Sequence, residues 1–301
     1  MFGIRSGDLV AIPSLTFSAT AQAIVTLGGI PVFVDIDPLT WVITPDTLAP
    51  VLYTPGLRGV IAVHLFGNMA PVYDIKKICQ NRSLFLIEDA AQSLGSTLQI
   101  PSHESAGRVA AFSFDARKQL PIGQGGMLVF SGTDQEANIR SLRHCGLQLV
   151  NGGWLAVRPG TNHLMSALGA ALGRSILKRI DAWNVARRRV KSELDQAMEG
   201  NDVIACQQVT PGCQQVPHRW AIMFNDPALP DAVLKKAKEA HVPFQRLYAP
   251  LHMHPFFADS PKAGPLTHTE CFHERHLCLD ISPFEVERQI QECLNVLEEV
   301  L

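Results

Sequence analysis

Short apolar runs alternate with helical patterns over the first half of the chain. Six runs rich in β-branched or aromatic residues predict strands at Leu9–Ile12, Ile30–Asp35, Gly59–Val63, Leu84–Ile87, Val109–Phe114 and Met127–Phe130. Between them, apolar residues recur at spacings of three and four, which predicts helices at Thr20–Leu27, Pro45–Val51 and Val72–Cys79. Strands and helices in alternation are typical of an α/β fold with a mostly parallel central sheet flanked by helices.

The second half of the chain carries longer helical patterns and fewer strand-like runs. Helices are expected at Asp134–His144, Ser166–Ile180, Ala232–Ala240 and Phe284–Leu301, a strand at Arg219–Phe224, and a glycine-rich loop around Gly152, Gly153 and Gly160. We predict a large α/β domain over residues 1–160, a connecting helix over 161–195 and a small C-terminal α+β domain over 196–301. The basic run Arg187–Lys191 on the connecting helix predicts a solvated face.

The bulk composition narrows the class of partner. The chain has 301 residues, of which 47% are hydrophobic, and its 26 basic and 28 acidic residues give a net charge of −2. No block of like charge marks a nucleic-acid or membrane surface, so the expected partners are small molecules. The sequence has neither an apolar run of about eighteen residues nor the pattern of a signal peptide, which predicts a cytoplasmic protein.

The cysteines do not suggest a disulfide framework or a metal site. All seven are scattered without a C-x-x-C spacing, so we expect reduced and mostly buried thiols. Histidines and cysteines gather between His268 and Cys278, but their spacing fits no standard metal site. We expect a surface loop there and no bound metal.

The first candidate for chemistry is Asp89, which follows the predicted strand Leu84–Ile87. Open α/β sheets bind their ligands at the carboxyl ends of the strands, where this carboxylate is expected. An acidic residue at a strand end also serves as a helix cap, so Asp89 alone leaves both interpretations open.

The second candidate is Lys118, in the turn between the predicted strands Val109–Phe114 and Met127–Phe130. Ser113 precedes the lysine and the glycine-rich segment Gly123–Gly126 follows it. A hydroxyl and backbone amides can hold a phosphate while a lysine amine forms an imine with an aldehyde. A single lysine before such a loop is a weak signal, because most lysines point into solvent.

Five ordered motifs together identify a family. They are Gly7-Asp8-x-Val10-x-x-Pro13-x-x-Thr16-Phe17, Pro31-Val32-Phe33-Val34-Asp35-Ile36-Asp37, Val63-His64-Leu65-Phe66-Gly67, Ile87-Glu88-Asp89-Ala90-Ala91-Gln92 and Phe112-Ser113-Phe114-x-x-x-Lys118-x-Leu120. In order and spacing the chain resembles the DegT/DnrJ/StrS sugar aminotransferases. The resemblance implies the type I fold of pyridoxal 5′-phosphate (PLP) enzymes, a homodimer, and amino transfer from an amino-acid donor, glutamate, to a nucleotide-linked keto sugar.

The resemblance also assigns roles to single residues. It makes Lys118 the Schiff-base lysine and proton carrier, and it places Asp89 beside the ring nitrogen of PLP. Gln92 would face the ring hydroxyl, Phe17 would stack on the ring, and Ser113 would bind the phosphate. Two further roles rest on shorter matches: Asn162 would reach the phosphate of the neighbouring subunit, and His252, in Pro250-Leu251-His252, would lie near the substrate.

The sequence also departs from the family pattern. Family members carry a segment before the equivalent of Gly7-Asp8, with a helix N-terminus that binds the phosphate, so the chain is expected to be truncated at its N-terminus relative to the family and to bind PLP more weakly. A non-catalytic or regulatory remnant of the same fold therefore stays open as the alternative function. Related PLP-dependent sugar dehydratases lack the lysine, and Lys118 argues against them.

Overall fold

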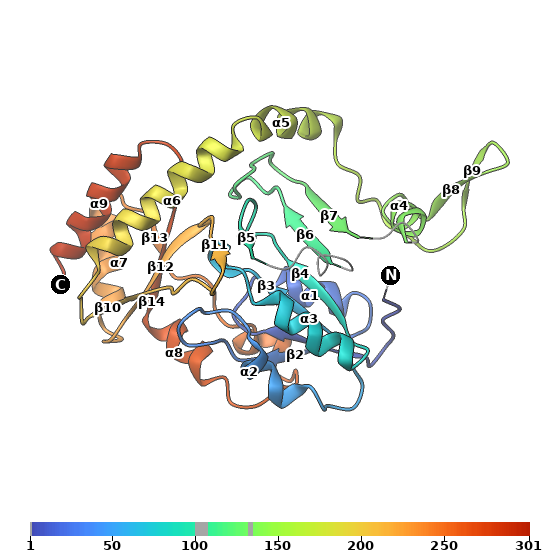
Figure 1. Cartoon of the computed structure of the whole chain (residues 1–301), viewed down its shortest axis with the longest axis horizontal. Coiled ribbons are helices and arrows are strands. Elements are labelled where there is room, and N and C mark those ends of the chain that lie inside the picture. Colours follow the sequence, from blue (N-terminus) through green and yellow to red (C-terminus); the bar gives the residue numbers. More distant parts are fainter. Residues whose placement is uncertain (1, 100–107, 132–134) are drawn as a thin grey trace.

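The large sheet confirms the α/β prediction. The computed structural model describes residues 2–99, 108–131 and 135–301, and Figure 1 shows their arrangement. A six-stranded sheet has the order β2-β1-β3-β4-β6-β7. Its strands are β1 (Leu9–Pro13), β2 (Ile30–Val34), β3 (Leu57–Val63), β4 (Phe85–Asp89), β6 (Val109–Ser113) and β7 (Gly126–Phe130). All pairs are parallel except β6 with β7. Each predicted strand is present, with small shifts at its ends.

Helices cover both faces of this sheet, which explains why its strands are apolar runs rather than alternating ones. Val10 and Ile12 of β1 pack with α1 (Ala19–Val25), whereas Ala11 packs on the opposite face, towards α2 (Pro45–Leu48) and α3 (Val72–Asn81). The helix expected at Pro45–Val51 is divided into α2 and a 3-10 turn, because Pro50 has no N–H to continue α-helical bonding.

A second, antiparallel sheet lies in the C-terminal part. Its order is β10-β12-β14-β13, with β10 (Ile204–Cys206), β12 (Arg219–Phe224), β13 (Phe244–Gln245) and β14 (His276–Asp280). The core on this sheet includes Val190 of α6 (Ile180–Ala197), Val233 of α7 (Leu229–Glu239) and Ile290 of α9 (Val286–Glu298). In Figure 1, α5 (Ala167–Leu177) and α6 run along one side of the molecule and connect its two parts. No described helix is both long and apolar enough to cross a bilayer.

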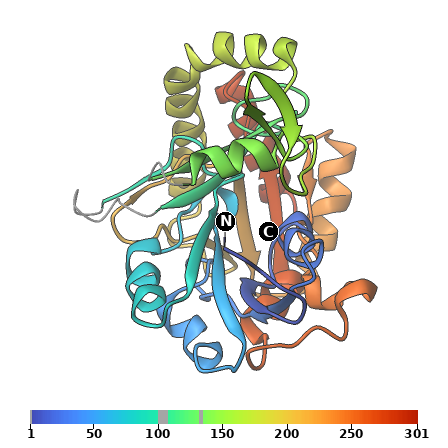
Figure 2. The same cartoon turned by 90° about the vertical axis from the view of Figure 1, so that its right-hand side faces the viewer.

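The glycine-rich loop expected around Gly152 is instead a β-hairpin. The strands β8 (Leu147–Val150) and β9 (Gly153–Ala156) pair antiparallel. Asn151 and Gly152 both have positive φ, of 49° and 81°, as a tight two-residue hairpin turn requires. The hairpin and α4 (Glu136–Leu142) extend from the body, and Figure 2 shows them in front of the sheet. Of the helix expected at Asp134–His144, Asp134 lies outside the described residues.

The prediction of a surface loop between His268 and Cys278 is wrong. This segment forms α8 (Thr267–Arg275) followed by β14, and both His276 and Cys278 are fully buried. The His276 ring stacks on Phe272 at 4.2 Å between ring centroids. The polar residues of this segment make the apolar pattern of the helix and of the short strand hard to recognise in the sequence. Within the described ranges, no group of histidine, cysteine and acidic side chains is arranged to hold a metal ion.

The basic run of α6 is also only partly solvated, contrary to expectation. Arg189 is exposed, but Arg187 and Lys191 are 6% and 8% exposed because this face of α6 packs against the rest of the molecule. Lys191 pairs with Asp195 one turn along the helix. Burial lowers the pKa of Arg187 to about 10, and its Nη1 has no hydrogen-bond partner in the part of the chain that the structure describes.

Candidate active site

Lys118 lies in the turn that follows β6, with its side chain partly buried. Its backbone N–H donates to the Asp115 carbonyl oxygen at 2.9 Å, whereas its Nζ has no hydrogen-bond or ion-pair partner among the residues described. Burial, and next the charge of Arg219, lower the pKa of Lys118 to about 8, although Asp89 acts in the opposite direction. An unpartnered lysine amine that is partly neutral near neutrality is a nucleophile.

The backbone around Lys118 is fixed by the glycine-rich segment. Ala116 N–H donates to the Gly123 carbonyl oxygen at 3.0 Å, and Gly123 has a φ of 88°. A Cβ on Gly126 would lie 2.8 Å from the Phe112 carbonyl oxygen, so this close approach requires glycine. Ser113, at the end of β6, accepts the Asp115 N–H at 3.3 Å and still has its own proton to donate.

Asp89 ends β4 at the carboxyl edge of the sheet, beside β3 and β6, as predicted. Its Oδ2 accepts a hydrogen bond from Thr20 Oγ1 at 2.6 Å, and its Oδ1 accepts the Ala91 N–H at 3.1 Å. Thr20 is itself 3.1 Å from Thr16 Oγ1. These contacts fix the orientation of the carboxylate and leave lone pairs for a further donor.

A buried ion pair lies directly behind Asp89. Arg108 donates to both oxygens of Glu88, at 2.7 and 2.5 Å, and His64 Nε2 lies 3.1 Å from Glu88 Oε2. Because His64 Nδ1 accepts the Ala70 N–H at 3.2 Å, a neutral His64 donates its Nε2 proton to Glu88. Burial raises the pKa of Glu88, but the bonds from Arg108 and His64 outweigh it and hold that pKa at about 2.

Replacing Glu88 with glutamine is therefore expected to destabilise the fold. The lowered pKa gives the native protein stability that is present above pH 4.5 and is lost as the pH falls towards 2, on the order of 3 kcal/mol in total. Thermal unfolding is measured at a series of pH values from neutral downwards. The unfolding midpoint of Glu88→Gln should be lower than that of the parent at neutral pH, and it should fall less as the pH is lowered. Glu292→Gln, in an exposed pair with Arg288, should change stability by less than about 1 kcal/mol. Equal acid curves for parent and Glu88→Gln would contradict the assignment.

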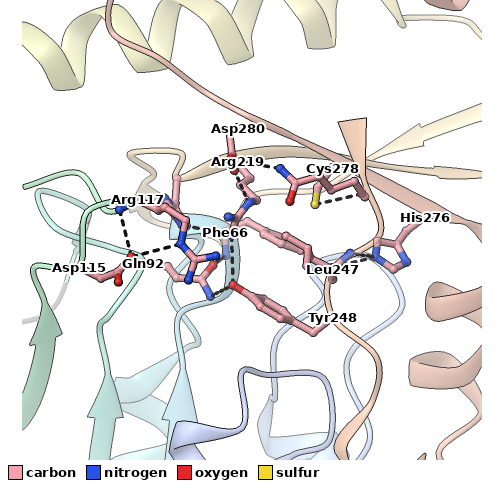
Figure 3. Close-up of polar contacts among 12 residues, drawn as sticks. Phe66, Gln92, Asp115, Arg117, Arg219, Leu247, Tyr248, His276, Cys278 and Asp280 are labelled. Atoms are coloured by element: carbon pink, nitrogen blue, oxygen red, sulfur yellow. Dashed lines mark hydrogen bonds and ion pairs between the residues drawn. The ribbon is translucent and has the colours of Figure 1, made fainter. Parts of the chain in front are cut away.

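Gln92 connects the large sheet to the C-terminal part of the chain. Its Oε1 accepts the Phe66 N–H at 2.9 Å, and its Nε2 donates to the Tyr248 hydroxyl at 3.3 Å. The same hydroxyl accepts a hydrogen bond from Arg219 Nη1 at 3.1 Å. Figure 3 shows this chain of contacts, with Asp280 on the far side of Arg219.

The sequence motifs predict no role for Tyr248 or Arg219. The available signal was Arg219 at the start of the predicted strand Arg219–Phe224, since a basic residue that opens a buried strand needs a polar partner. Tyr248 carries no comparable signal, because it follows a short strand in an irregular segment. Phe17 faces Tyr248 at 6.0 Å between ring centroids, and its ring is 51% exposed, so one face is available to a ligand.

His252 is held by its own chain. Its Nδ1 lies 2.7 Å from Ser14 Oγ and its Nε2 lies 3.1 Å from Glu270 Oε1. Ser14 Oγ also accepts the His252 N–H at 3.3 Å, so the serine proton goes to Nδ1 and the Nε2 proton to Glu270. Both ring nitrogens are thus engaged.

Asn162 lies after the hairpin, in an exposed segment that pairs with His144. Its Oδ1 accepts the Leu164 N–H at 3.4 Å. None of its described polar contacts joins it to Lys118, Asp89 or Ser113 of the same chain. The structure therefore brings together Lys118, Asp89, Gln92 and Phe17 near the sheet edge and leaves Asn162 apart from them.

These residues fit an aldehyde cofactor that carries a phosphate and a protonated ring. The free amine of Lys118 matches the aldehyde, the Asp89 carboxylate matches a ring N–H, and Ser113 with the adjacent turn amides matches a phosphate. A lysine amine that has no partner among the described residues, together with a carboxylate at the carboxyl edge of the same α/β sheet, fits the class of PLP-dependent enzymes.

The particular family follows from comparison with known proteins. The chain belongs to the DegT/DnrJ/EryC1/StrS aminotransferase family, whose sequence profile matches residues 1–298. The match confirms the family and the fold predicted from the motifs. The protein is an aminotransferase and its cofactor is pyridoxal 5′-phosphate.

Three relatives illustrate the match. GDP-perosamine synthase of Caulobacter vibrioides is 31% identical over 260 residues, which cover 85% of this chain and 69% of the relative. UDP-N-acetyl-3-dehydro-alpha-D-glucosamine 3-aminotransferase of Acidithiobacillus ferrooxidans is 31% identical over 307 residues, covering 99% and 79%. The crystal structure of the aminotransferase TlmJ of Streptoalloteichus hindustanus superposes with a TM-score of 0.88 at 27% identity, covering 100% and 82%.

Proposed function

We propose that this aminotransferase transfers an amino group from glutamate to a nucleotide-linked keto sugar, in the biosynthesis of a surface polysaccharide or a glycoside. The observation that carries the chemistry is the unpartnered amine of Lys118 with the charge of Asp89 acting on it. The substrate class is supported by two relatives, which are named for a GDP-linked and a UDP-linked sugar.

Each residue has a defined task in this proposal. When bound, PLP supplies an aldehyde that condenses with amines and a ring that accepts the electrons of a breaking C–H bond. Lys118 would hold the aldehyde through its amine, and the same amine, once free, would carry the proton that the transfer has to move. Asp89 keeps the ring nitrogen protonated because a carboxylate stabilises that charge.

The remaining residues orient the ring. Gln92 would face the ring hydroxyl, Phe17 would stack on one ring face, and Ser113 would donate its hydroxyl proton to the phosphate. Asn162 would act on the phosphate in the neighbouring subunit, since its described polar contacts do not join it to Lys118, Asp89 or Ser113 of its own chain. His252 serves on the substrate side as a positioning residue, since Ser14 and Glu270 occupy its ring nitrogens.

The alternative function, a non-catalytic or regulatory remnant, is less well supported. A remnant has no need to keep a partly buried lysine that lacks a partner in the described part of the chain, because such a charge destabilises the fold. The seven cysteines, all free, are in keeping with a reducing compartment, and we propose that the protein works in the cytoplasm.

The test is a transamination assay with PLP and glutamate against a panel of acceptors. The panel contains nucleotide-linked keto sugars, the same keto sugars without the nucleotide, and a cyclitol ketone. Formation of 2-oxoglutarate that depends on a nucleotide-linked acceptor is expected. Turnover only with the cyclitol, or equal turnover with and without the nucleotide, would contradict the proposed substrate class.

The hairpin supports the proposed homodimer. Its apolar side chains point into solvent, with Leu149, Trp154 and Leu155 being 63%, 61% and 54% exposed. Exposed apolar patches of this kind on a projecting element mark association surfaces. We propose that the hairpin packs on a second copy and brings Asn162 to that copy's phosphate site.

Replacing Trp154 with aspartate is expected to weaken the dimer. Loss of a central aromatic contact costs at least about 2 kcal/mol, which corresponds to roughly thirtyfold in the dissociation constant. Light scattering at decreasing protein concentration measures the change, and activity should fall with the dimer fraction. Val209→Asp, an exposed apolar residue away from the hairpin, is the matched control. A dimer of unchanged strength in Trp154→Asp would rule out the hairpin as its interface.

A further inference from the structure

Arg219 is a buried arginine whose nitrogens are only partly used. It opens β12, is 3% exposed, and forms an ion pair with Asp280 at 2.5 Å from Nε to Oδ1. Its Nη1 lies 3.2 Å from His218 Nε2 and 3.1 Å from the Tyr248 hydroxyl. Its Nη2 forms none of these contacts, and its Nε, although close to Asp280, has no aligned hydrogen-bond partner within residues 2–99, 108–131 and 135–301. A guanidinium has five N–H groups in a planar fork, so one side of the fork is available.

The position of Arg219 relative to the reacting amine follows from the hydrogen bonds of its neighbours. Tyr248 is hydrogen-bonded to both Arg219 and Gln92, and the Gln92 carbonyl oxygen accepts a hydrogen bond from Gln119, the residue after Lys118. Three residues, Tyr248, Gln92 and Gln119, therefore connect Arg219 to Lys118. Among the charges that act on the Lys118 amine, that of Arg219 has the largest influence.

The surroundings carry excess positive charge. Arg219 is paired with Asp280 and Arg117 with Asp115, whereas Arg187 and Lys118 have no acidic partner among the described side chains. Thr20 and the Ala91 N–H already bind Asp89. Cations in excess around a partly buried site favour an anion among them, because an uncompensated charge away from water is unfavourable.

We propose that Arg219 binds the carboxylate next to the amine of the amino-acid donor. This inference deepens the proposed function and rests on it. In an amino acid the carboxylate is bonded to the carbon that carries the amine, so a group that binds it must lie close to Lys118. The phosphates of a nucleotide-linked keto sugar are separated from the keto carbon by ring atoms and would bind farther away. The planar fork of arginine matches a carboxylate through two parallel hydrogen bonds.

The experiment compares glutamate with 4-aminobutyrate, which lacks only the carboxylate next to the amine. Holoenzyme is mixed with each donor, without acceptor, and the cofactor absorbance is followed through a single turnover. For Arg219→Gln, the preference for glutamate over 4-aminobutyrate should fall by roughly ten- to a hundredfold, as for loss of hydrogen bonds to a charged group. The ratio cancels any change in the reactivity of Lys118, since Lys118 serves both donors. Arg288→Gln, an exposed arginine of α9, should keep the parent ratio.

Binding without reaction separates a carboxylate site from a phosphate site. In calorimetric titrations, Arg219→Gln should bind glutarate more weakly than the parent does. Its affinity for uridine diphosphate should be unchanged. Arg219→Lys keeps the charge but not the fork, so it should lose part of the glutamate preference, and it carries the test if Arg219→Gln does not fold.

Failure of the proposed function and failure of the Arg219 inference give different results. A parent enzyme that fails to react with glutamate contradicts the proposed function. A reactive parent with an unchanged donor ratio in both Arg219 variants overturns this inference alone. Weaker uridine diphosphate binding with unchanged glutarate binding overturns it as well, and would make Arg219 a phosphate ligand.

Discussion

Lys118→Ala is expected to abolish transamination, with a loss of at least about a hundred- to ten-thousandfold, the usual contribution of a positioned proton-transfer group. Lys118 is the partly buried lysine beside Asp89, and its amine has no competing partner in the described structure. Borohydride reduction of the holoenzyme followed by peptide mapping should place the cofactor on Lys118 and on no other lysine. Lys235→Ala, an exposed lysine of α7, should retain activity.

The pH dependence of the same reaction follows from the lowered pKa of Lys118. With a pKa of about 8, roughly a tenth of the amine is neutral at pH 7, whereas an ordinary lysine would be almost fully charged. Cofactor attachment should therefore accelerate as the pH rises and level off above about 8. Attachment that still rises steeply near pH 10, or a reduced adduct on another lysine, would contradict the assignment.

Asp89→Asn should retain PLP but lose most transamination. A neutral amide cannot stabilise a ring proton as a carboxylate does, so the ring accepts electrons poorly. We expect a loss of roughly a hundredfold or more, in the range of other positioned proton-holding groups. Single-turnover absorbance measurements with glutamate separate this loss from cofactor dissociation.

Thr20→Val supplies a graded comparison for Asp89. It removes the 2.6 Å hydrogen bond to Asp89 Oδ2 but leaves the charge, so its activity should lie between those of the parent and Asp89→Asn. Asp46→Asn, an exposed acid in α2, should behave as the parent. Near-normal turnover by Asp89→Asn would mean that Asp89 is only a structural acceptor for Thr20.

The large sheet and the centre of the site could be predicted from the sequence because both depend on local patterns. The strands are buried on both faces, so each is a distinct apolar run. Lys118 and Asp89 follow two of these strands, at the edge where parallel sheets bind ligands. The roles of all the site residues stay predictions, namely those of Lys118, Asp89, Ser113, Gln92, Phe17, Asn162 and His252.

What the sequence did not reveal depends on contacts between distant segments. The strand β13 is two residues long, too short for any periodicity. Arg187 belongs to a basic run that a local pattern assigns to solvent, and only the packing of α6 buries it. Arg219 and Tyr248 reach the site because the antiparallel sheet packs beside Gln92, and no spacing in the sequence encodes that approach.

The strand β7 presents an exposed apolar edge through which the protein is expected to aggregate. It is the outermost strand of the large sheet, and Met127, Leu128 and Val129 are 51%, 39% and 49% exposed. An apolar outer strand is a template on which another chain can extend the ladder. Concentrated stocks should therefore become turbid by edge-to-edge pairing of β7, and a lysine in place of Val129 should reduce this turbidity when the protein is prepared for crystallisation.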